Sequence, residues 1–248
     1  MFDLRYHVAS LAAVFFALVI GILVGVALAS HGLGNADIAV LFIGPADSTI
    51  RTAIEGTLGD AGASMTRMRA ITVPVNAHAI EGALAKRSAL ASFAVGRKRF
   101  VNVGRELATE FVTGKDTALW DALEGQLVEF RFGAGKRPVD GVVLVRTAEP
   151  QTRAASAQLV AGLFRAFADG GVPAVGVELR GTFPSAVQTY KHYGLSSVDD
   201  LDLRIGRVAL AVLLSPDSIG GHYGLQDVDD AIVPKIPPVQ PLTTTSGG

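Results

Sequence analysis

The feature that most constrains this chain is an uninterrupted apolar stretch near its N-terminus, residues 8–29. Ser10 is the only polar side chain in it. A helix rises 1.5 Å per residue, so roughly 22 residues extend about 33 Å, enough to cross the hydrocarbon core of a bilayer. No other stretch of the sequence is apolar for this long. We therefore expect one transmembrane helix over residues 8–29, after a short tail at residues 1–7.

The flanks of this stretch indicate how it is used. Ala27-Leu28-Ala29 matches the small-x-small pattern for signal peptidase, so a cleaved signal peptide is one reading. The apolar run is longer than the roughly 7–15 residues of a signal h-region, which favours an uncleaved anchor. Arg5 lies just before the stretch, and flanking positive charges stay on the cytoplasmic side. We expect a single-pass membrane protein with a cytoplasmic N-terminus and an extracytoplasmic domain.

Small residues recur at every fourth position of the stretch. On a helix they form one stripe, and Gly21 and Gly25 make a G-x-x-x-G pair that lets two membrane helices approach closely. Chance is the alternative, because Ala and Gly are common throughout the chain. We predict a homo-oligomer, a dimer in the simplest case, with a helix–helix interface at Ala13, Ala17, Gly21 and Gly25.

Composition limits what the remaining residues can do. The chain has 248 residues, a net charge of −1 and no cysteine. Its balanced charge gives no long-range field, so nucleic acid is not an expected partner. The absence of cysteine excludes disulfides, cysteine-ligated zinc, iron–sulfur clusters and thiol catalysis. The part beyond the anchor is large enough for one sizeable core, and we expect one domain.

The pattern of that domain begins with a short linker, residues 30–36 (SHGLGNA), which we expect to be flexible. Residues 37–43 (DIAVLFI) are typical of a buried strand. Asp47 or Ser48 is placed to cap the helix that follows, and Gly62 to end it. Residues 65–73 alternate as a second strand, so the chain begins with a β-α-β unit.

A second such unit is clearer still. Residues 139–146 and 172–179 are apolar strands, and Thr152 opens an amphipathic helix between them. Apolar strands that alternate with amphipathic helices imply a mostly parallel sheet covered on both faces. We therefore predict a Rossmann-like α/β domain over residues 37–230. Residues 231–248 are rich in Pro, Thr and Ser, and we expect a disordered tail.

Further elements are predicted less sharply. Residues 77–95, 105–112 and 116–123 are typical of helices, and residues 127–132 of a half-exposed strand. The spacing over residues 199–214 is helical, with Asp199 and Asp200 at its positive end, although a strand over residues 208–214 fits as well. The basic residues at 96–99 are typical of a solvated turn, or of a contact with anionic lipid or cell-wall polymer.

A search for chemistry finds little. The first β-α turn, Gly44-Pro45-Ala46-Asp47, has neither nucleotide-binding fingerprint, and Asp47 would oppose an anion there. Neither G-x-S-x-G nor H-E-x-x-H is present, and the five histidines are scattered. We therefore expect a protein that is not an enzyme.

Metal ligands are equally sparse. Met65 and Met68 are the one thioether pair, but residues three apart on a strand point to opposite faces. His222 lies among glycines in Gly220-Gly221-His222-Tyr223-Gly224 and is either a hydrogen-bonded turn residue or a contact for metal or partner.

Two segments resemble one known family. Residues 2–18 read FDLRYHVASLAAVFFAL, and residues 198–224 contain VDDLD, GRVAL and GGHYG. Both resemble the actinobacterial copper transport protein MctB family. That resemblance implies a pore-forming envelope protein with a role in copper efflux and homeostasis, assigned to the outer membrane in mycobacteria. Copper is then the candidate ligand, and His222 the candidate metal residue.

A second function stays open beside the first. Related members, called SteB, are described as membrane partners of a cell-division protein that control peptidoglycan hydrolysis through a coiled coil. The resemblance thus also implies a non-enzymatic envelope scaffold or adaptor with an envelope or division protein as partner. This chain departs from the pattern, because residues 30–36 are too short for even two heptads.

Overall fold

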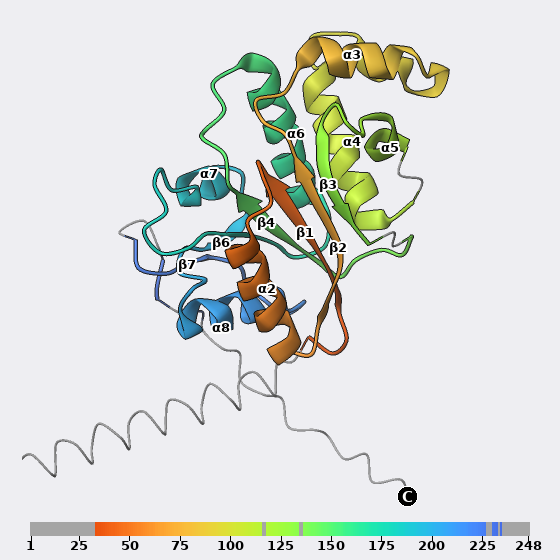
Figure 1. Ribbon diagram of the computed structural model, residues 1–248. Coiled ribbons are helices and arrows are strands. Elements are labelled where there is room, and N and C mark those ends of the chain that lie inside the picture. Colours follow the sequence, from red (N-terminus) through yellow and green to blue (C-terminus); the bar gives the residue numbers. More distant parts are fainter. Residues whose placement is uncertain (1–32, 116–117, 134–135, 227–229, 233, 235–248) are drawn as a thin grey trace, which may run out of the picture.

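The structure is a computed structural model (Figure 1) that describes residues 33–115, 118–133, 136–226, 230–232 and 234. Its centre is a seven-stranded sheet in the order β3-β2-β1-β4-β5-β6-β7. Every neighbouring pair is parallel except β2 and β3, which confirms the predicted mostly parallel sheet. The strands are β1 (Asp37–Ile43), β2 (Ser64–Ile71), β3 (Val128–Phe132), β4 (Gly141–Arg146), β5 (Ala174–Val177), β6 (Ser196–Val198) and β7 (His222–Tyr223).

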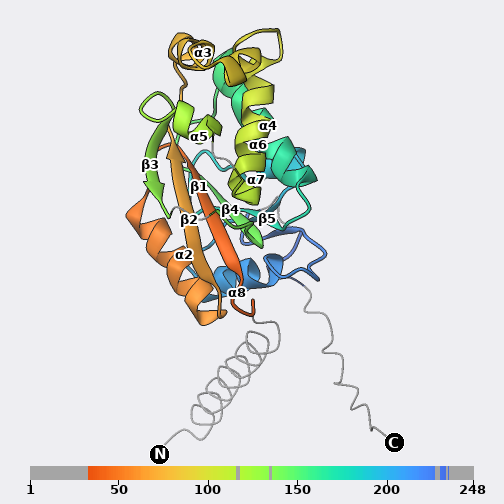
Figure 2. The same ribbon diagram turned by 90° about the vertical axis from the view of Figure 1, so that its right-hand side faces the viewer.

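Helices cover both faces of the sheet, as predicted (Figure 2). One core cluster packs beneath α2 (Ser48–Asp60) and α8 (Arg204–Leu213). The other core cluster joins the opposite face of the sheet to the remaining helices. Those helices are α3 (Ala77–Ala85), η1 (Ser88–Ala94), α4 (Arg99–Thr113), α5 (Ala118–Ala122), α6 (Ala154–Asp169) and α7 (Val187–His192).

The first β-α-β unit consists of β1, α2 and β2, as the sequence predicts. β1 is buried along nearly its whole length and pairs with both β2 and β4. The Asp47 carboxylate caps α2 by accepting hydrogen bonds from the backbone N–H groups of Thr49 and Ile50, at 2.8 and 2.9 Å. The cap therefore occupies N–H groups that a bound anion would need.

The second unit depends on two small residues where α4 crosses α6. A Cβ atom added at Gly104 would overlap the backbone of Leu159, and one added at Gly162 would overlap that of Val101. Glycine at both positions thus lets the two helix backbones touch. This close approach builds one side of the core over β4 and β5.

Several predicted boundaries were wrong. The helix predicted over residues 77–95 is two elements, α3 and η1, and the one predicted at residues 105–112 begins earlier, at Arg99. The helix predicted from residue 199 begins only at Arg204, because Asp199 and Asp200 belong to the turn after β6. The short elements α7, β6 and β7 were not predicted.

Both ends of the folded body also differ from expectation. In the second half of the predicted linker, Leu33 is buried and its N–H bonds to the Ala61 carbonyl at 2.8 Å. At the other end, Ala231 bridges to Tyr223, although it was predicted to begin the disordered tail. Hydrogen bonds to the body fix both of these residues.

The predicted anchor at residues 8–29, with its interface at Ala13, Ala17, Gly21 and Gly25, lies outside the described residues. Within the part of the chain that the structure describes, no helix combines the length and the apolar character needed to span a membrane.

Candidate functional site

The carboxyl ends of β5, β6 and β7 bring acidic residues together at one edge of the sheet. In parallel sheets this is the edge where ligands usually bind. Glu178 follows β5, while Asp199 and Asp200 follow β6, and all three are almost completely buried. Buried carboxylates need compensating partners, so their hydrogen bonds decide what this edge can do.

Both carboxylate oxygens of Glu178 accept hydrogen bonds. One carboxylate oxygen, Oε1, accepts hydrogen bonds from Ser185 Oγ and Gln226 Nε2, both at 2.6 Å. The other, Oε2, accepts one from the backbone N–H of Ala186 at 2.8 Å. Glu178 thereby joins the loop before α7 to the segment after β7.

Asp199 holds the same segment from the other side. Its two carboxylate oxygens accept hydrogen bonds from the backbone N–H groups of Leu225 and Gln226, at 2.9 and 3.0 Å. Nearby, Asp202 accepts one from the backbone N–H of Arg180 at 2.8 Å. These carboxylates therefore serve as anchors for loops.

Asp200 is the exception at this edge. It is completely buried, and neither carboxylate oxygen has a hydrogen-bond partner among the described residues. Burial, together with the neighbouring charges of Asp199 and Asp202, raises the pKa of Asp200 to about 6. Asp200 is therefore a proton-binding group that titrates close to neutral pH.

His222, the predicted candidate ligand, lies on β7 and is 8% exposed. Its Nδ1 and Ser197 Oγ are hydrogen-bonded at 2.9 Å, and its backbone N–H donates to Asp230 at 3.0 Å. Burial lowers the pKa of His222, although the Asp230 charge opposes that shift. The lowered pKa favours the neutral ring, which is the form that binds metals, and Ser197 occupies the Nδ1 side of the ring.

The methionine pair differs from its prediction. A bulge in β2 shifts the register between Ile38 and Ala39, so that Ile38 pairs with Met65 and Ala39 with Arg67. Met65 and Met68 consequently pack against the same core cluster, beneath α2 and α8, and the prediction that they point to opposite faces was wrong. Met68 is buried there and Met65 is partly buried, so both act as core side chains.

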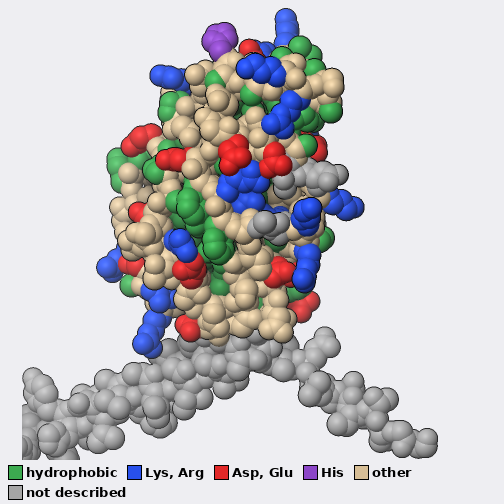
Figure 3. Space-filling view, turned by 45° about the vertical axis from the view of Figure 1, so that its right-hand side comes forward, with side chains coloured by type: hydrophobic (Ala, Val, Ile, Leu, Met, Phe, Trp, Pro, Cys, Tyr) green, Lys and Arg blue, Asp and Glu red, His purple; other side chains and the backbone are tan. Residues whose placement is uncertain are grey.

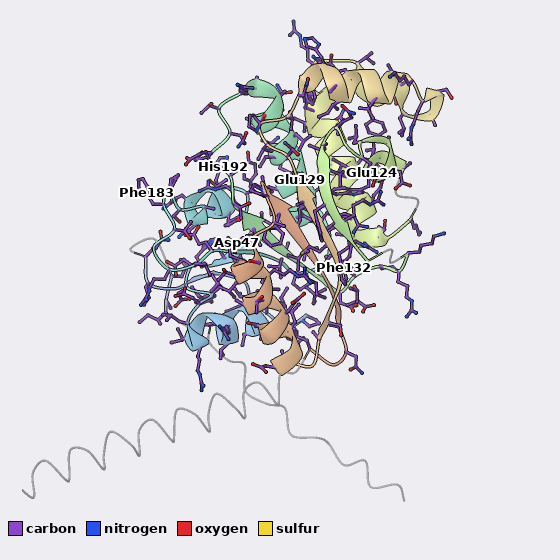
Figure 4. The ribbon with its side chains drawn as sticks, viewed as in Figure 1. Asp47, Glu124, Glu129, Phe132, Phe183 and His192 are labelled. Atoms are coloured by element: carbon purple, nitrogen blue, oxygen red, sulfur yellow. The ribbon has the colours of Figure 1, made fainter. Side chains whose placement is uncertain are left out.

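No three His, Asp or Glu side chains are grouped as a metal centre within the described ranges. The structure brings His222 together with Ser197 and Asp230, and it places the methionines on the far side of β1 from this end of the sheet. Figure 4 shows another histidine, His192, on α7, where it is exposed.

Sequence reasoning missed the roles of Glu178, Asp199 and Ser197. Glu178 had one usable signal, because it comes directly after an apolar run, whereas Asp199 follows two serines and a single valine. Ser197 had none, since its contact with His222 exists only because the short strands β6 and β7 pair, with Ser197 opposite His222.

Comparison of the sequence with known protein families finds a match. A family model described as "Copper transport outer membrane protein, MctB" matches residues 1–37 and 27–234, nearly the whole chain. No curated protein matches the sequence.

Proposed function

This chain belongs to the MctB family of copper transport outer membrane proteins, and from that premise we propose that it lowers cellular copper by acting in copper efflux at the cell envelope. The observation that carries the proposal is the extent of the match, which includes both the apolar N-terminal stretch and the α/β body. The family description supports an envelope protein, and copper is its cargo.

His222 is the residue that we propose as a copper ligand. A neutral imidazole is a good ligand for copper, and a second hydrogen bond that fixes the ring is typical of metal-binding histidines. Ser197 Oγ supplies that bond, at 2.9 Å from Nδ1. One imidazole supplies a single donor atom to the copper ion. The remaining donor atoms would arrive with the metal or come from a second chain.

The membrane arrangement completes the proposal. Residues 8–29 would span the bilayer once, with the N-terminus in the cytoplasm and the α/β body outside. One apolar helix cannot enclose a pathway for an ion, so a conducting form would be a homo-oligomer. The stripe at Ala13, Ala17, Gly21 and Gly25 would pack those helices together.

Calorimetric titration of the purified full-length chain with Cu(I) and with Cu(II) tests direct copper handling. We expect saturable binding that is lost in His222→Ala. His192→Ala is the matched control, because it removes an exposed histidine from a surface helix and should leave binding unchanged. Absence of binding to the wild-type chain at micromolar copper would exclude direct copper handling by this protein.

A non-enzymatic envelope scaffold or adaptor is the second candidate, with a division protein or a peptidoglycan hydrolase system as partner. One surface favours it. The exposed basic residues Lys86, Arg87, Arg97 and Lys98 lie around η1, at the opposite end of the body from Leu33, where the described chain begins (Figure 1). Figure 3 shows basic side chains at that end as well as elsewhere on the same face. A partner could contact this surface without any buried site.

The two candidates predict different phenotypes. A scaffold predicts that Arg97→Ala combined with Lys98→Ala changes cell length or septum placement without changing cellular copper. Lys136→Ala is the control, because it removes an exposed cation far from η1 in the sequence. Efflux assigns these two residues no role, so it predicts that the double variant leaves both division and cellular copper unchanged.

A further inference from the structure

The end of the body opposite Leu33 carries an excess of positive charge. Residues 77–99, which include α3, η1 and the start of α4, contain five cations and one acid, a net charge of +4. The whole chain has a net charge of −1, so the rest of its residues carry −5. The charge of this chain is therefore strongly polarised, and its balanced total conceals one basic end.

Four of these five cations have no compensating acid. The one acid of the segment, Glu81, lies 2.6 Å from Arg99 Nε and compensates that residue. The other four cations are exposed and make no ion pair within the residues that the structure describes. These four, which we call the distal basic surface, are Lys86, Arg87, Arg97 and Lys98.

The backbone holds both pairs of neighbouring cations in fixed positions. The first pair lies between the buried Leu84 and Leu90, where the Arg87 N–H donates to the Leu84 carbonyl at 3.1 Å and the Leu90 N–H to the Arg87 carbonyl at 2.8 Å. The second pair comes just before the buried Phe100 on α4. Because η1 packs against both α3 and α4, the two pairs belong to one surface.

The residues around these cations favour a polyanion over a folded protein as the ligand. Interfaces between folded proteins depend on large apolar side chains that become buried. Among the exposed large hydrophobic residues of the described chain, only Val95 belongs to this segment. The other exposed positions beside the cations are small: Ala85, Ser88, Ala89, Ser92 and Gly96. A linear polyanion is bound through charge and needs no apolar pocket.

The position of the distal basic surface indicates where such a polyanion would lie. This step rests on the membrane arrangement proposed above, in which the body lies outside the cytoplasm. Only residues 30–32 separate the apolar stretch from Leu33, so the membrane would lie at the Leu33 end of the body. The distal basic surface is at the opposite end and faces away from that lipid (Figure 1).

We propose that the distal basic surface binds a linear polyanion of the cell envelope, a polymer with phosphate or carboxylate groups along its length. Its four cations contact successive anionic groups of the polymer. The body is then held at both ends, by the N-terminal stretch in the membrane and by the polymer at the distal basic surface. Copper takes no part in this contact.

Binding to fluorescent inorganic polyphosphate tests the proposal, with the full-length chain in nanodiscs of a neutral phospholipid. Four contacts to a flexible polyanion give a slope of about −2.8 for log K against log salt, so the wild type should lose about 50-fold in affinity between 50 and 200 mM salt. A quadruple variant removes the surface: Lys86→Gln, Arg87→Gln, Arg97→Gln and Lys98→Gln. It should bind at least about tenfold more weakly at the lower salt concentration and lose most of the salt dependence.

A second quadruple variant is the matched control, because it removes the same charge from other parts of the surface. Its substitutions are Lys115→Gln, Lys136→Gln, Arg153→Gln and Arg204→Gln, all at exposed positions without an ion pair in the described chain. Both variants have a net charge of −5, so a difference between them reports where the charge lies. The control should bind like the wild type, and an equal loss in both variants would overturn the proposal.

A parallel titration with poly-L-glutamate distinguishes the two kinds of anionic group, since the polymer that binds more tightly identifies phosphate or carboxylate. Failure of the wild type to bind either polymer at 50 mM salt would overturn the proposal. Tighter binding to vesicles of an anionic phospholipid than to either polymer would also overturn it, because the surface would then serve a membrane.

Copper titration of the first quadruple variant separates this proposal from copper efflux. We expect unchanged copper binding together with the loss of polymer binding. If the wild-type chain binds the polymer but no copper, the efflux role fails and the polymer contact stands. If the first variant loses copper binding and polymer binding together, the contact is not independent of copper and the proposal is wrong.

Discussion

Asp199 and Asp200 are neighbours in the sequence and are both buried, yet their carboxylates have opposite surroundings. Asp199 accepts two backbone hydrogen bonds, from Leu225 and Gln226, whereas neither oxygen of Asp200 has a partner among the described residues. A buried charge that accepts hydrogen bonds is compensated, and one that does not is costly. The same change, Asp to Asn, should therefore have opposite effects at the two positions.

Asp200→Asn should stabilise the protein at pH 8. The pKa of Asp200 is about 6 in the folded state and about 3.9 in an unfolded chain, so the folded state binds the proton more tightly. The stabilisation that comes from this tighter proton binding is then complete below about pH 4 and is lost as the pH rises through 6. The charged form costs about 3 kcal/mol at pH 8 by this linkage, and part of that cost should be recovered in the variant.

Urea unfolding at pH 5 and pH 8 measures this effect. Glu110 titrates in the same direction, because burial raises its pKa to about 7, so the wild-type slope alone does not isolate Asp200. The difference in the free energy of unfolding between wild type and Asp200→Asn isolates the contribution of Asp200. An equal difference at both pH values would show that Asp200 does not titrate in this range.

Asp199→Asn should destabilise the protein at the same pH. The amide keeps one acceptor oxygen and replaces the other with a donor, which leaves the N–H of Leu225 or Gln226 without its acceptor. We expect a loss of about 1–3 kcal/mol, measured by urea unfolding at pH 8. Stability unchanged from wild type would mean that the segment after β7 is not held by Asp199.

Gly162→Ala should destabilise the contact between α4 and α6. The added Cβ would overlap the backbone of Val101, and overpacking of this kind costs about 1–3 kcal/mol. Gly56→Ala on α2 is the matched control, because its Cβ would meet nothing within 4 Å. The control should gain up to about 1 kcal/mol from helix propensity. Thermal unfolding of both variants compares the two, and a stabilised Gly162→Ala would refute the close crossing.

Ser197→Ala should weaken copper binding without removing a ligand. The hydroxyl is the hydrogen-bond partner of His222 Nδ1, and loss of such a group typically costs about tenfold or more in metal affinity. Ser64→Ala is the control, since Ser64 is exposed at the start of β2. Calorimetry with copper measures both. Equal affinity in the two variants would show that Ser197 does not orient the imidazole.

The long apolar strands and amphipathic helices could be predicted because one residue pattern decides each of them. β1 begins and ends at the residues that its apolar run predicts, and Asp47 caps α2 as its position indicates. β6 and β7 are only a few residues long, and they form because neighbouring strands offer hydrogen bonds. Such elements are fixed by tertiary contacts and leave no periodic signal.

The candidate site was predictable only in part, for the same reason. His222 could be identified from its setting among glycines, but its contact with Ser197 depends on the pairing of β6 with β7. Asp199 and Asp200 were predicted to begin a helix, because acids favour a helix N-terminus. In the structure, the carboxylate of Asp199 binds the loop after β7 instead, and α8 starts five residues after it, at Arg204.

The measurement that tests the central claim most directly is the copper content of host cells grown in added copper, with and without this protein. Copper efflux predicts that cells lacking the protein accumulate copper. The wild-type chain and His192→Ala should restore the normal content, and His222→Ala should not. Cellular copper that does not change when the protein is lost would contradict the account.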